Sequence, residues 1–247
     1  MILGSKCQLT IGTLSIEHSL QFYSKLGFRV VAKGASQYKW CKITDDSLLI
    51  LLYENGNNYL GVTYFDKDIM PRMDVITDLN IPLVQNAPQE KIFISKEDLI
   101  VTLAQSNETE SMVNVVLAAD DYLSGANNSF PIKNKVLGTF GELGVNVNSV
   151  TQSQEYWEEL GYRKIHYTEK PYRRILVTDD LFNLGLHENS KMASQSIIYY
   201  TNNLEDTKHS LTTLNIDFEE EHFQFWNGEH SLHLRTPEQQ HIYIAEI

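Results

Sequence analysis

The sequence predicts an α+β protein made of four modules with the element order β-α-β-β-β, paired into two similar domains. The first observation is a repeat: the pattern Ser-x-x-aromatic-aromatic-x-x-Leu-Gly-aromatic spans Ser19 to Phe28 and returns from Ser153 to Tyr162, 134 positions later. The second is the order of strand-like and helix-like segments within each copy. The third is a stretch rich in Gly, Asn and Ser at 124–129, which separates the copies.

The first module begins with an alternating strand at 9–13. Ser15 is a plausible N-cap for a helix from Ile16 to Leu26, because its hydroxyl can accept a hydrogen bond from a first-turn amide. Gly27 then ends the helix, since glycine adopts the left-handed conformation at no steric cost. Three strands are predicted next, at 28–31, 38–43 and 47–53.

The second module repeats this order more loosely. It reads as a strand at 60–64, a helix at 68–79 and strands near 92–94 and 99–103. The second half of the chain echoes both modules, and its last one reads as strands and a helix at 197–201, 204–214, 232–234 and 242–245. We therefore divide the chain into a first domain (1–117), a linker (118–135) and a second domain (136–247).

The 134-residue offset also relates single positions outside the helix pattern. It carries Tyr38 to Tyr172, the turn at 44–46 to the turn at 178–180, and Glu54 to Glu188 without a gap. A residue needed for chemistry that both halves share should therefore appear in both copies.

Composition and charge limit the partners. The chain of 247 residues carries a net charge of −12 and has no run of Lys and Arg. Because nucleic-acid binding depends on clustered cations, we expect no nucleic-acid partner, and no association with anionic membrane surfaces. The acidity favours a small neutral or cationic ligand; alternatively, it serves only to keep the protein in solution.

The two cysteines, Cys7 and Cys41, do not form a disulfide framework. At the equivalent positions the second half has Gly141 and Ile175, so neither thiol belongs to a feature that the repeat shares. The N-terminus does not have the pattern of a signal peptide, and no stretch reaches the ~18 apolar residues of a membrane span. We therefore expect a cytoplasmic protein.

Several of these features together resemble the vicinal oxygen chelate superfamily. They are the module order, the repeated helix pattern, the segment Leu184 to Glu188, and the turn Thr236-Pro237-Glu238 before the last strand. That superfamily includes glyoxalase I, extradiol dioxygenases, fosfomycin-resistance enzymes and bleomycin-resistance proteins. The resemblance covers nearly the whole chain outside the linker. It implies two glyoxalase-like domains, each with a curved sheet around a cavity, on a fold that hosts metal enzymes and metal-free binders.

The resemblance also indicates where a metal ion would be held. Metal-binding members take His, Glu or Gln ligands from the first and last strands of each module. The matching positions in this sequence are Gln8, Leu51, about Gly61 and about Thr102 in the first half, and Glu142, Gly185, about Ser196 and about Tyr243 in the second. Neither set provides several imidazole or carboxylate ligands. We therefore expect no metal ion and no cofactor.

The main functional hypothesis is metal-independent binding of a small molecule in a cup-shaped cavity, as in bleomycin-resistance proteins, without catalysis. The candidate ligand contacts are Tyr38, Trp40, Tyr64, Tyr172, Tyr199 and His233, although the same aromatic side chains would also suit an ordinary β core. One alternative is a divergent glyoxalase-like lyase or isomerase that uses Glu142 as a base or metal ligand. Another is a non-catalytic scaffold with filled cavities. The linker length permits pairing of the halves within one chain or between the chains of a homodimer.

The densest group of possible metal ligands is the run from Glu219 to His222, with His230, His233 and His241 downstream. We interpret this group as an exposed β segment with scattered histidines, and keep His233 as a candidate inward-facing group. His187-Glu188 is interpreted as the end of a strand, because adjacent side chains of a strand point to opposite faces and cannot converge on one atom.

Overall fold

The computed structural model describes residues 2–106, 114, 131–221 and 230–247. The first half contains β1 (Lys6–Gly12), α1 (Ile16–Lys25), β2 (Arg29–Ala35), β3 (Lys39–Thr44), β4 (Leu49–Glu54), β5 (Tyr59–Asp66), α2 (Met70–Asp78), β6 (Leu83–Ala87), β7 (Glu90–Ile94) and β8 (Ile100–Gln105). The second half contains β9 (Thr139–Asn146), α4 (Val150–Glu159), β10 (Arg163–Thr168), β11 (Arg174–Thr178), β12 (Asn183–His187), β13 (Gln195–Thr201), α5 (Leu204–Thr213), β14 (Glu219–Glu221), β15 (Ser231–Arg235) and β16 (His241–Glu246).

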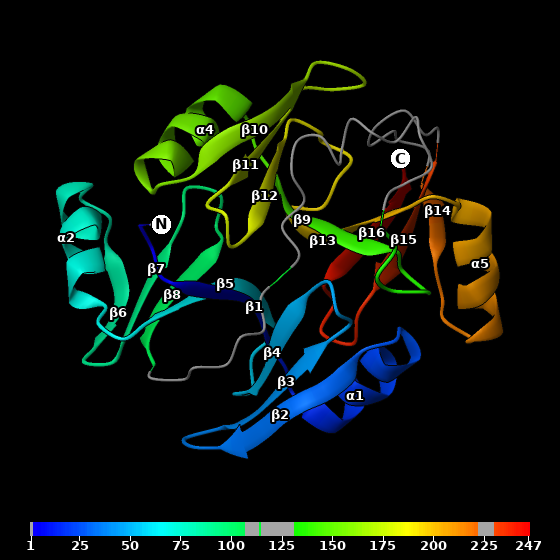
Figure 1. Cartoon of the computed structure of the whole chain (residues 1–247), viewed down its shortest axis with the longest axis horizontal. Helices are drawn as coiled ribbons and strands as arrows, with labels where there is room; N and C mark the ends of the chain where they lie inside the picture. The colour runs from blue at the N-terminus through cyan, green and yellow to red at the C-terminus, as the bar shows by residue number, and fades with distance from the viewer. Residues whose placement is uncertain (1, 107–113, 115–130, 222–229) are drawn as a thin grey trace.

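The strands form two eight-stranded sheets, with the helices around their outside (Figure 1). Their orders are β2-β3-β4-β1-β5-β8-β7-β6 and β10-β11-β12-β9-β13-β16-β15-β14. Within each sheet the first strands of two modules pair antiparallel, β1 with β5 and β9 with β13. The structure therefore has the predicted α+β fold with four modules. Most of the predicted linker, 118–135, lies outside the described residues.

The helix that carries the repeated pattern begins and ends for the predicted local reasons. Ser15 is the N-cap of α1, and its side chain accepts a hydrogen bond from the His18 amide. Gly27 follows the helix with φ +90°, and Gly161 after α4 has φ +91°. Both helices therefore end in the same way, which explains why Leu-Gly recurs in both copies.

The repeated glutamate also has a structural role. Glu54 Oε2 accepts a hydrogen bond from the Ile16 amide at 2.9 Å, and Glu188 Oε1 accepts one from the Val150 amide at the same distance. Each carboxylate thus satisfies an amide in the first turn of the helix in its own half, where the helix dipole also favours negative charge. The glutamates shared by the copies stabilise the fold.

The two sheets share one hydrophobic core. A single cluster of buried side chains contains Leu9 and Ile11 from β1 together with Leu143 and Val145 from β9. Polar contacts also join the halves: the Phe140 amide donates a hydrogen bond to Ser47 Oγ at 3.0 Å. The two halves of one chain therefore pair with each other.

The sequence did not predict strand β6, and it predicted β14 only as part of an exposed β segment that begins at Glu219. Both are short strands at a sheet edge, and most of their side chains are exposed. They do not show the alternation of apolar and polar residues that marks a half-buried strand.

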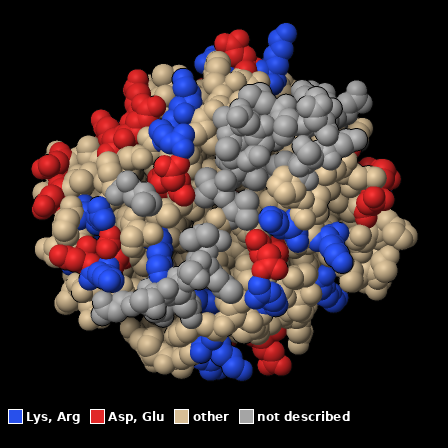
Figure 2. All heavy atoms as spheres, in the orientation of Figure 1, with Lys and Arg blue, Asp and Glu red and all other residues tan. Residues whose placement is uncertain are grey.

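On the face in Figure 2, acidic and basic side chains are interspersed. Among the described residues, no helix is both long and apolar enough to cross a membrane.

Candidate functional site

Each sheet has one face on the shared core and one on the opposite side. We call the second face of the first sheet, with Thr10, Thr63 and Thr102, the first cup. The corresponding face of the second sheet, with Glu142 and His187, is the second cup. Because successive side chains of a strand alternate between faces, the strand register fixes which residues line each cup.

The first cup contains a cavity of about 390 Å³. Its walls come from both modules of the first half and combine aromatic rings with neutral polar groups. The lining residues are Thr10, Gln37, Tyr38, Leu51, Tyr53, Asn55, Tyr59, Thr63, Phe65, Gln85, Glu90, Ile92, Thr102 and Ala104. Burial, with smaller contributions from Tyr53 and Glu90, raises the pKa of Tyr59 to about 12, so its phenol is neutral at physiological pH. The volume lies in the usual range for small-molecule sites, about 300–1,000 Å³.

A buried hydrogen-bonded network occupies the centre of the second cup. Arg174 Nη2 donates to Glu142 Oε2 at 2.5 Å and to the Tyr200 hydroxyl at 2.6 Å. His187 Nε2 donates to Glu142 Oε1 at 2.9 Å. The Tyr172 hydroxyl lies 2.9 Å from His187 Nδ1 and donates to it when the imidazole is neutral. The second cup is thus built around a buried ion pair and differs from the first.

The network fixes the protonation states of its members. Burial acts to raise the pKa of Glu142, but the charge of Arg174 and the hydrogen bond from His187 outweigh it and hold the pKa at about 2. Burial lowers the pKa of His187 below its ordinary value, although the Glu142 contact opposes this shift. At neutral pH, Glu142 is a carboxylate paired with a guanidinium, and a group in that state is a poor general base.

Gly185 allows Glu142 and His187 to meet. A Cβ atom at Gly185 would lie 2.5 Å from Glu142 Oε1 and 2.6 Å from His187 Nε2. These separations are too short for any side chain, so the network requires glycine here. The equivalent residue of the first half is Leu51, which lines the open cavity.

The positions at which the fold's metal enzymes hold their ion do not suit one here. In the second sheet the strand register aligns Glu142 with Ile198 and Tyr243, and both Glu142 oxygens already accept hydrogen bonds. The register corrects the predicted Ser196 to Ile198, because the sequence anchored only the first strand of each half. A slip of two residues leaves the face unchanged.

The family positions of the first sheet do not suit a metal ion either. The register aligns Gln8 with Thr63 and Thr63 with Thr102, which corrects the predicted Gly61 by two residues. An amide and two hydroxyls do not make a strong site for a divalent transition-metal ion. The family positions therefore do not fit a metal ion in either half.

Besides Trp40, which is described below, three of the predicted ligand contacts lie on cup faces. Tyr38 lines the first cavity and is 38% exposed. Tyr172 belongs to the network of the second cup. His233 is buried on β15, at the edge of the second cup, where its ring stacks on Tyr243.

Two other predicted contacts, Tyr64 and Tyr199, lie in the core shared by the sheets. The Tyr64 hydroxyl contacts the Tyr162 hydroxyl, and the Tyr199 hydroxyl donates to Asp45 at 2.8 Å. Their positions follow from strand alternation, since each is adjacent to residues that face a cup. Neither side chain is available to a ligand in a cup.

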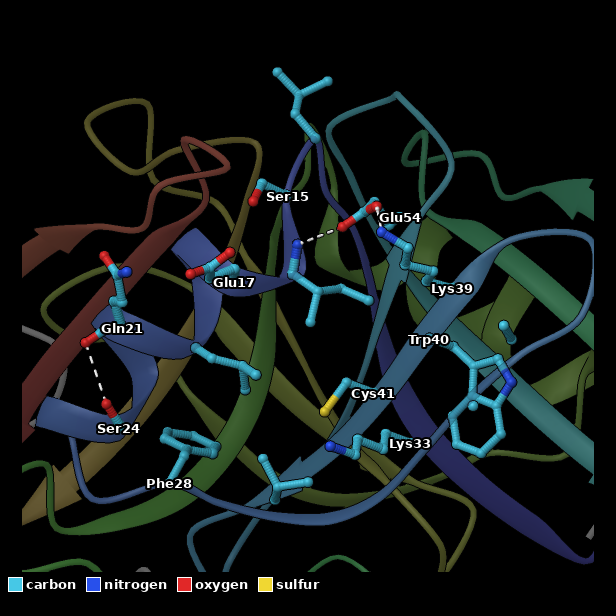
Figure 3. A pocket seen from close by; sticks show the side chains of 16 residues that line it. Ser15, Glu17, Gln21, Ser24, Phe28, Lys33, Lys39, Trp40, Cys41 and Glu54 are labelled. Atoms are coloured by element: carbon cyan, nitrogen blue, oxygen red, sulfur yellow. Dashed lines mark hydrogen bonds and ion pairs between the residues drawn. The ribbon is translucent and has the colours of Figure 1, made fainter.

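The sixth predicted contact, Trp40, lies on the cup face of the first sheet, opposite Tyr53 of β4. It also borders a groove on the outside of the first half, between α1, β2 and β3 (Figure 3). The groove is about 1,200 Å³, larger than typical small-molecule sites. Exposed Leu14 and Val30 contribute to its walls. Burial raises the pKa of the Cys41 thiol in this groove, so it is a poor nucleophile at neutral pH.

Sequence reasoning missed Arg174 and interpreted His187 as a strand end. The repeat contained a signal for both, because the equivalent residues of the first half are Trp40 and Tyr53. Two aromatic residues are thus replaced by two cationic or ionisable ones. Together with Glu142 in place of Gln8, this pattern could have indicated a charged network in one half only.

Comparison with known proteins identifies the fold. No protein-family model matches the sequence, and no curated protein matches it. The structure is similar to that of a catechol 2,3-dioxygenase, with 9% identity over 99% of this chain and 92% of the other, at a TM-score of 0.59. It is also similar to 2,2',3-trihydroxybiphenyl 1,2-dioxygenase from Sphingomonas wittichii strain RW1, with 12% identity over 100% and 91%, at a TM-score of 0.60. Homoprotocatechuate 2,3-dioxygenase from Arthrobacter globiformis gives 12% identity over 99% and 80%, at a TM-score of 0.63.

These neighbours are extradiol dioxygenases of the vicinal oxygen chelate superfamily. The chain has their fold, as the repeated helix pattern predicted. At these identities the likeness concerns the fold and leaves the activity open.

Proposed function

We propose that this protein binds a small neutral or cationic molecule in the first cup, without a metal ion at the family positions. The observation that carries this proposal is the 390 Å³ cavity, lined by aromatic rings and neutral polar groups. Such a site holds its ligand by shape, ring contacts and a few hydrogen bonds, and it needs no residue with a catalytic pKa.

The lining residues favour an aromatic ligand. Tyr38 and Tyr53 pack edge to face, with ring centroids 5.5 Å apart, and form one wall of the cavity. Thr10 Oγ1 and Thr63 Oγ1, 2.7 Å apart, provide polar groups on the strands that form its floor. A planar molecule with one or two hydrogen-bonding groups matches these contacts.

The charge of the lining favours a neutral or cationic ligand over an anion. Glu90 is the one charged residue among those that line the cavity, and Gln85 Nε2 donates to its Oε1 at 2.6 Å. An anion placed here would meet this carboxylate in a partly desolvated site. The rings of Tyr38, Tyr53 and Tyr59 favour a cation further, because their faces are electron-rich, whereas Phe65 already has the Lys42 ammonium 6.0 Å from its ring centroid.

The alternative of a lyase or isomerase that uses Glu142 has no comparable support. The carboxylate is fully buried and paired with Arg174, with its pKa held at about 2. The hypothesis of a scaffold with filled cavities suits the centre of the second cup, but the first cup keeps an open cavity.

The proposal can be tested with three probes that share one ring and differ in charge: benzyl alcohol, benzylamine and benzoate. Binding is measured by calorimetry on the full chain. We expect saturable binding of the alcohol or the amine and at least tenfold weaker binding of benzoate. Ala104→Phe, which fills the cavity, should abolish that binding.

Ala35→Phe is the matched control, because the same substitution then fills the outer groove instead. It should leave the affinity unchanged. Loss of binding in Ala35→Phe with retention in Ala104→Phe would move the site to the outer groove. A preference for benzoate would contradict the charge argument, and no saturable binding of any probe would contradict the proposal.

A further inference from the structure

We propose a metal site at the edge of the second cup, formed by Glu219, Glu221 and His233, that takes a divalent transition-metal ion such as zinc. One oxygen of each carboxylate and one imidazole nitrogen all lie within 4.8 Å of one another. This position is separate from the family positions around Glu142. It also departs from the sequence-based expectation of no metal ion.

Strand geometry brings the two carboxylates to the same face. In β14, Glu219 and Glu221 are two residues apart and share a face, while Glu220 points to the other side and forms an ion pair with Lys208 of α5. The register places Glu219 opposite His233 on β15. Two acidic side chains thus converge on one imidazole.

The imidazole is the observation that points to a cation. His233 is only 4% exposed, and its Nδ1 has no hydrogen-bond partner among the described residues. This atom lies 3.4 Å from Glu221 Oε1 and 3.5 Å from Glu219 Oε2. A buried polar atom without a hydrogen bond is costly, and it is satisfied when a metal ion binds between it and the carboxylates.

The distances suit a small ion. Zinc binds imidazole nitrogen and carboxylate oxygen at about 2.0–2.2 Å, so neighbouring ligands of a tetrahedral site lie about 3.4 Å apart. The two separations that involve His233 Nδ1 have this length. Only the two carboxylates need to approach each other, and Glu219 can move because its side chain is 75% exposed.

The surroundings of His233 hold its ring in one orientation. Its ring stacks on Tyr243 with centroids 4.7 Å apart and on His241 at 5.0 Å. His233 Nε2 lies 2.9 Å from His241 Nδ1. When Nε2 carries the proton and donates it to His241, Nδ1 presents a lone pair to the ion. This outer hydrogen bond is typical of histidines that bind metal ions. The three protein ligands leave a coordination position open for water.

The test uses the full chain without an affinity tag, freed of metal with a chelator and titrated with Zn²⁺ by calorimetry. We expect one ion per chain, with at least tenfold weaker binding in Glu219→Gln and in Glu221→Gln. The visible absorption of bound Co²⁺ reports its coordination geometry, and His233→Asn, which removes one of the three protein ligands, should change this spectrum.

Glu220→Gln is the matched control, because it makes the same charge change on the opposite face of the same strand. Its affinity should equal that of the unmodified protein. If Glu220→Gln weakened Zn²⁺ binding equally, the loss of affinity would follow from the change in net charge and not from loss of a metal ligand, which would contradict the proposal. Undiminished binding in Glu219→Gln/Glu221→Gln, or no saturable binding in the unmodified protein, would overturn the proposal.

Discussion

The buried ion pair of the second cup gives the sharpest stability prediction. Glu142→Gln keeps the shape of the side chain but leaves the Arg174 guanidinium, which is 1% exposed, without its counter-charge. Breaking a buried pair in this way costs about 3–5 kcal/mol, because the remaining charge stays desolvated. The free energy of unfolding should therefore fall by that amount at pH 7.

The pH dependence of the free energy of unfolding should change in the same variant. The folded-state pKa of Glu142 is about 2 against an ordinary 4.5, so the folded protein binds this proton more weakly than the unfolded chain does. The stabilisation is fully present above pH about 4.5 and is lost as the pH falls towards 2. At 1.36 kcal/mol per pKa unit it amounts to about 3 kcal/mol. Glu142→Gln should flatten the stability profile across this range.

Urea unfolding, followed by tryptophan fluorescence and by circular dichroism, measures both effects when the two transitions coincide. Glu158→Gln, an exposed carboxylate on α4, is the control and should change stability by less than about 0.5 kcal/mol. Replacing both members of the pair with Met should cost much less than the two single changes added together. A cost below about 1 kcal/mol for Glu142→Gln, or an unchanged acid profile, would refute the reasoning.

Two further predictions compare positions within the repeated helix pattern. Trp157→Ala should lower the free energy of unfolding in urea by about 3–5 kcal/mol, because its side chain is 1% exposed. Phe22→Ala, at the preceding aromatic position of the other copy, should cost less than half as much, because Phe22 is only partly buried. Equal costs for the two variants would contradict this prediction. Ser19→Ala should cost about 1–3 kcal/mol because Ser19 donates to the buried carboxylate of Glu238, while Ser153→Ala, the same change in the other half, should cost under about 1 kcal/mol. A larger loss in Ser153→Ala would show that this contact does not set the difference.

Much of the fold could be predicted because its signals are local. The capping hydroxyl of Ser15 and the positive φ of Gly27 act within one helix turn. The turn aspartates Asp46 and Asp180 both have positive φ, 70° and 68°, in keeping with their recurrence at one offset. The edge strand β6 was missed because its pairing with β7, and not its own residue pattern, makes it a strand.

The candidate sites were predicted less well, because a cup is formed by side chains from distant strands. Tyr38 lines the first cavity, whereas Tyr64, another predicted ligand contact, lies on the face that belongs to the core. Glu142 could be named as a candidate, yet its partner Arg174 lies 32 positions away on another strand. A shift of one residue in register reverses the face of every side chain in a strand.

The sequence alone determined that this protein consists of two copies of one unit, since the repeated glycines and glutamates act on backbone groups near them or in their own half. Only the tertiary structure decided that the copies differ in chemistry. Register and packing left a cavity in the first cup, joined Glu142, Arg174 and His187 at the centre of the second, and turned His233 towards two carboxylates. The physical reason is that caps and turns depend on short-range geometry, whereas charge pairing and metal ligation depend on atoms that folding brings together across a sheet.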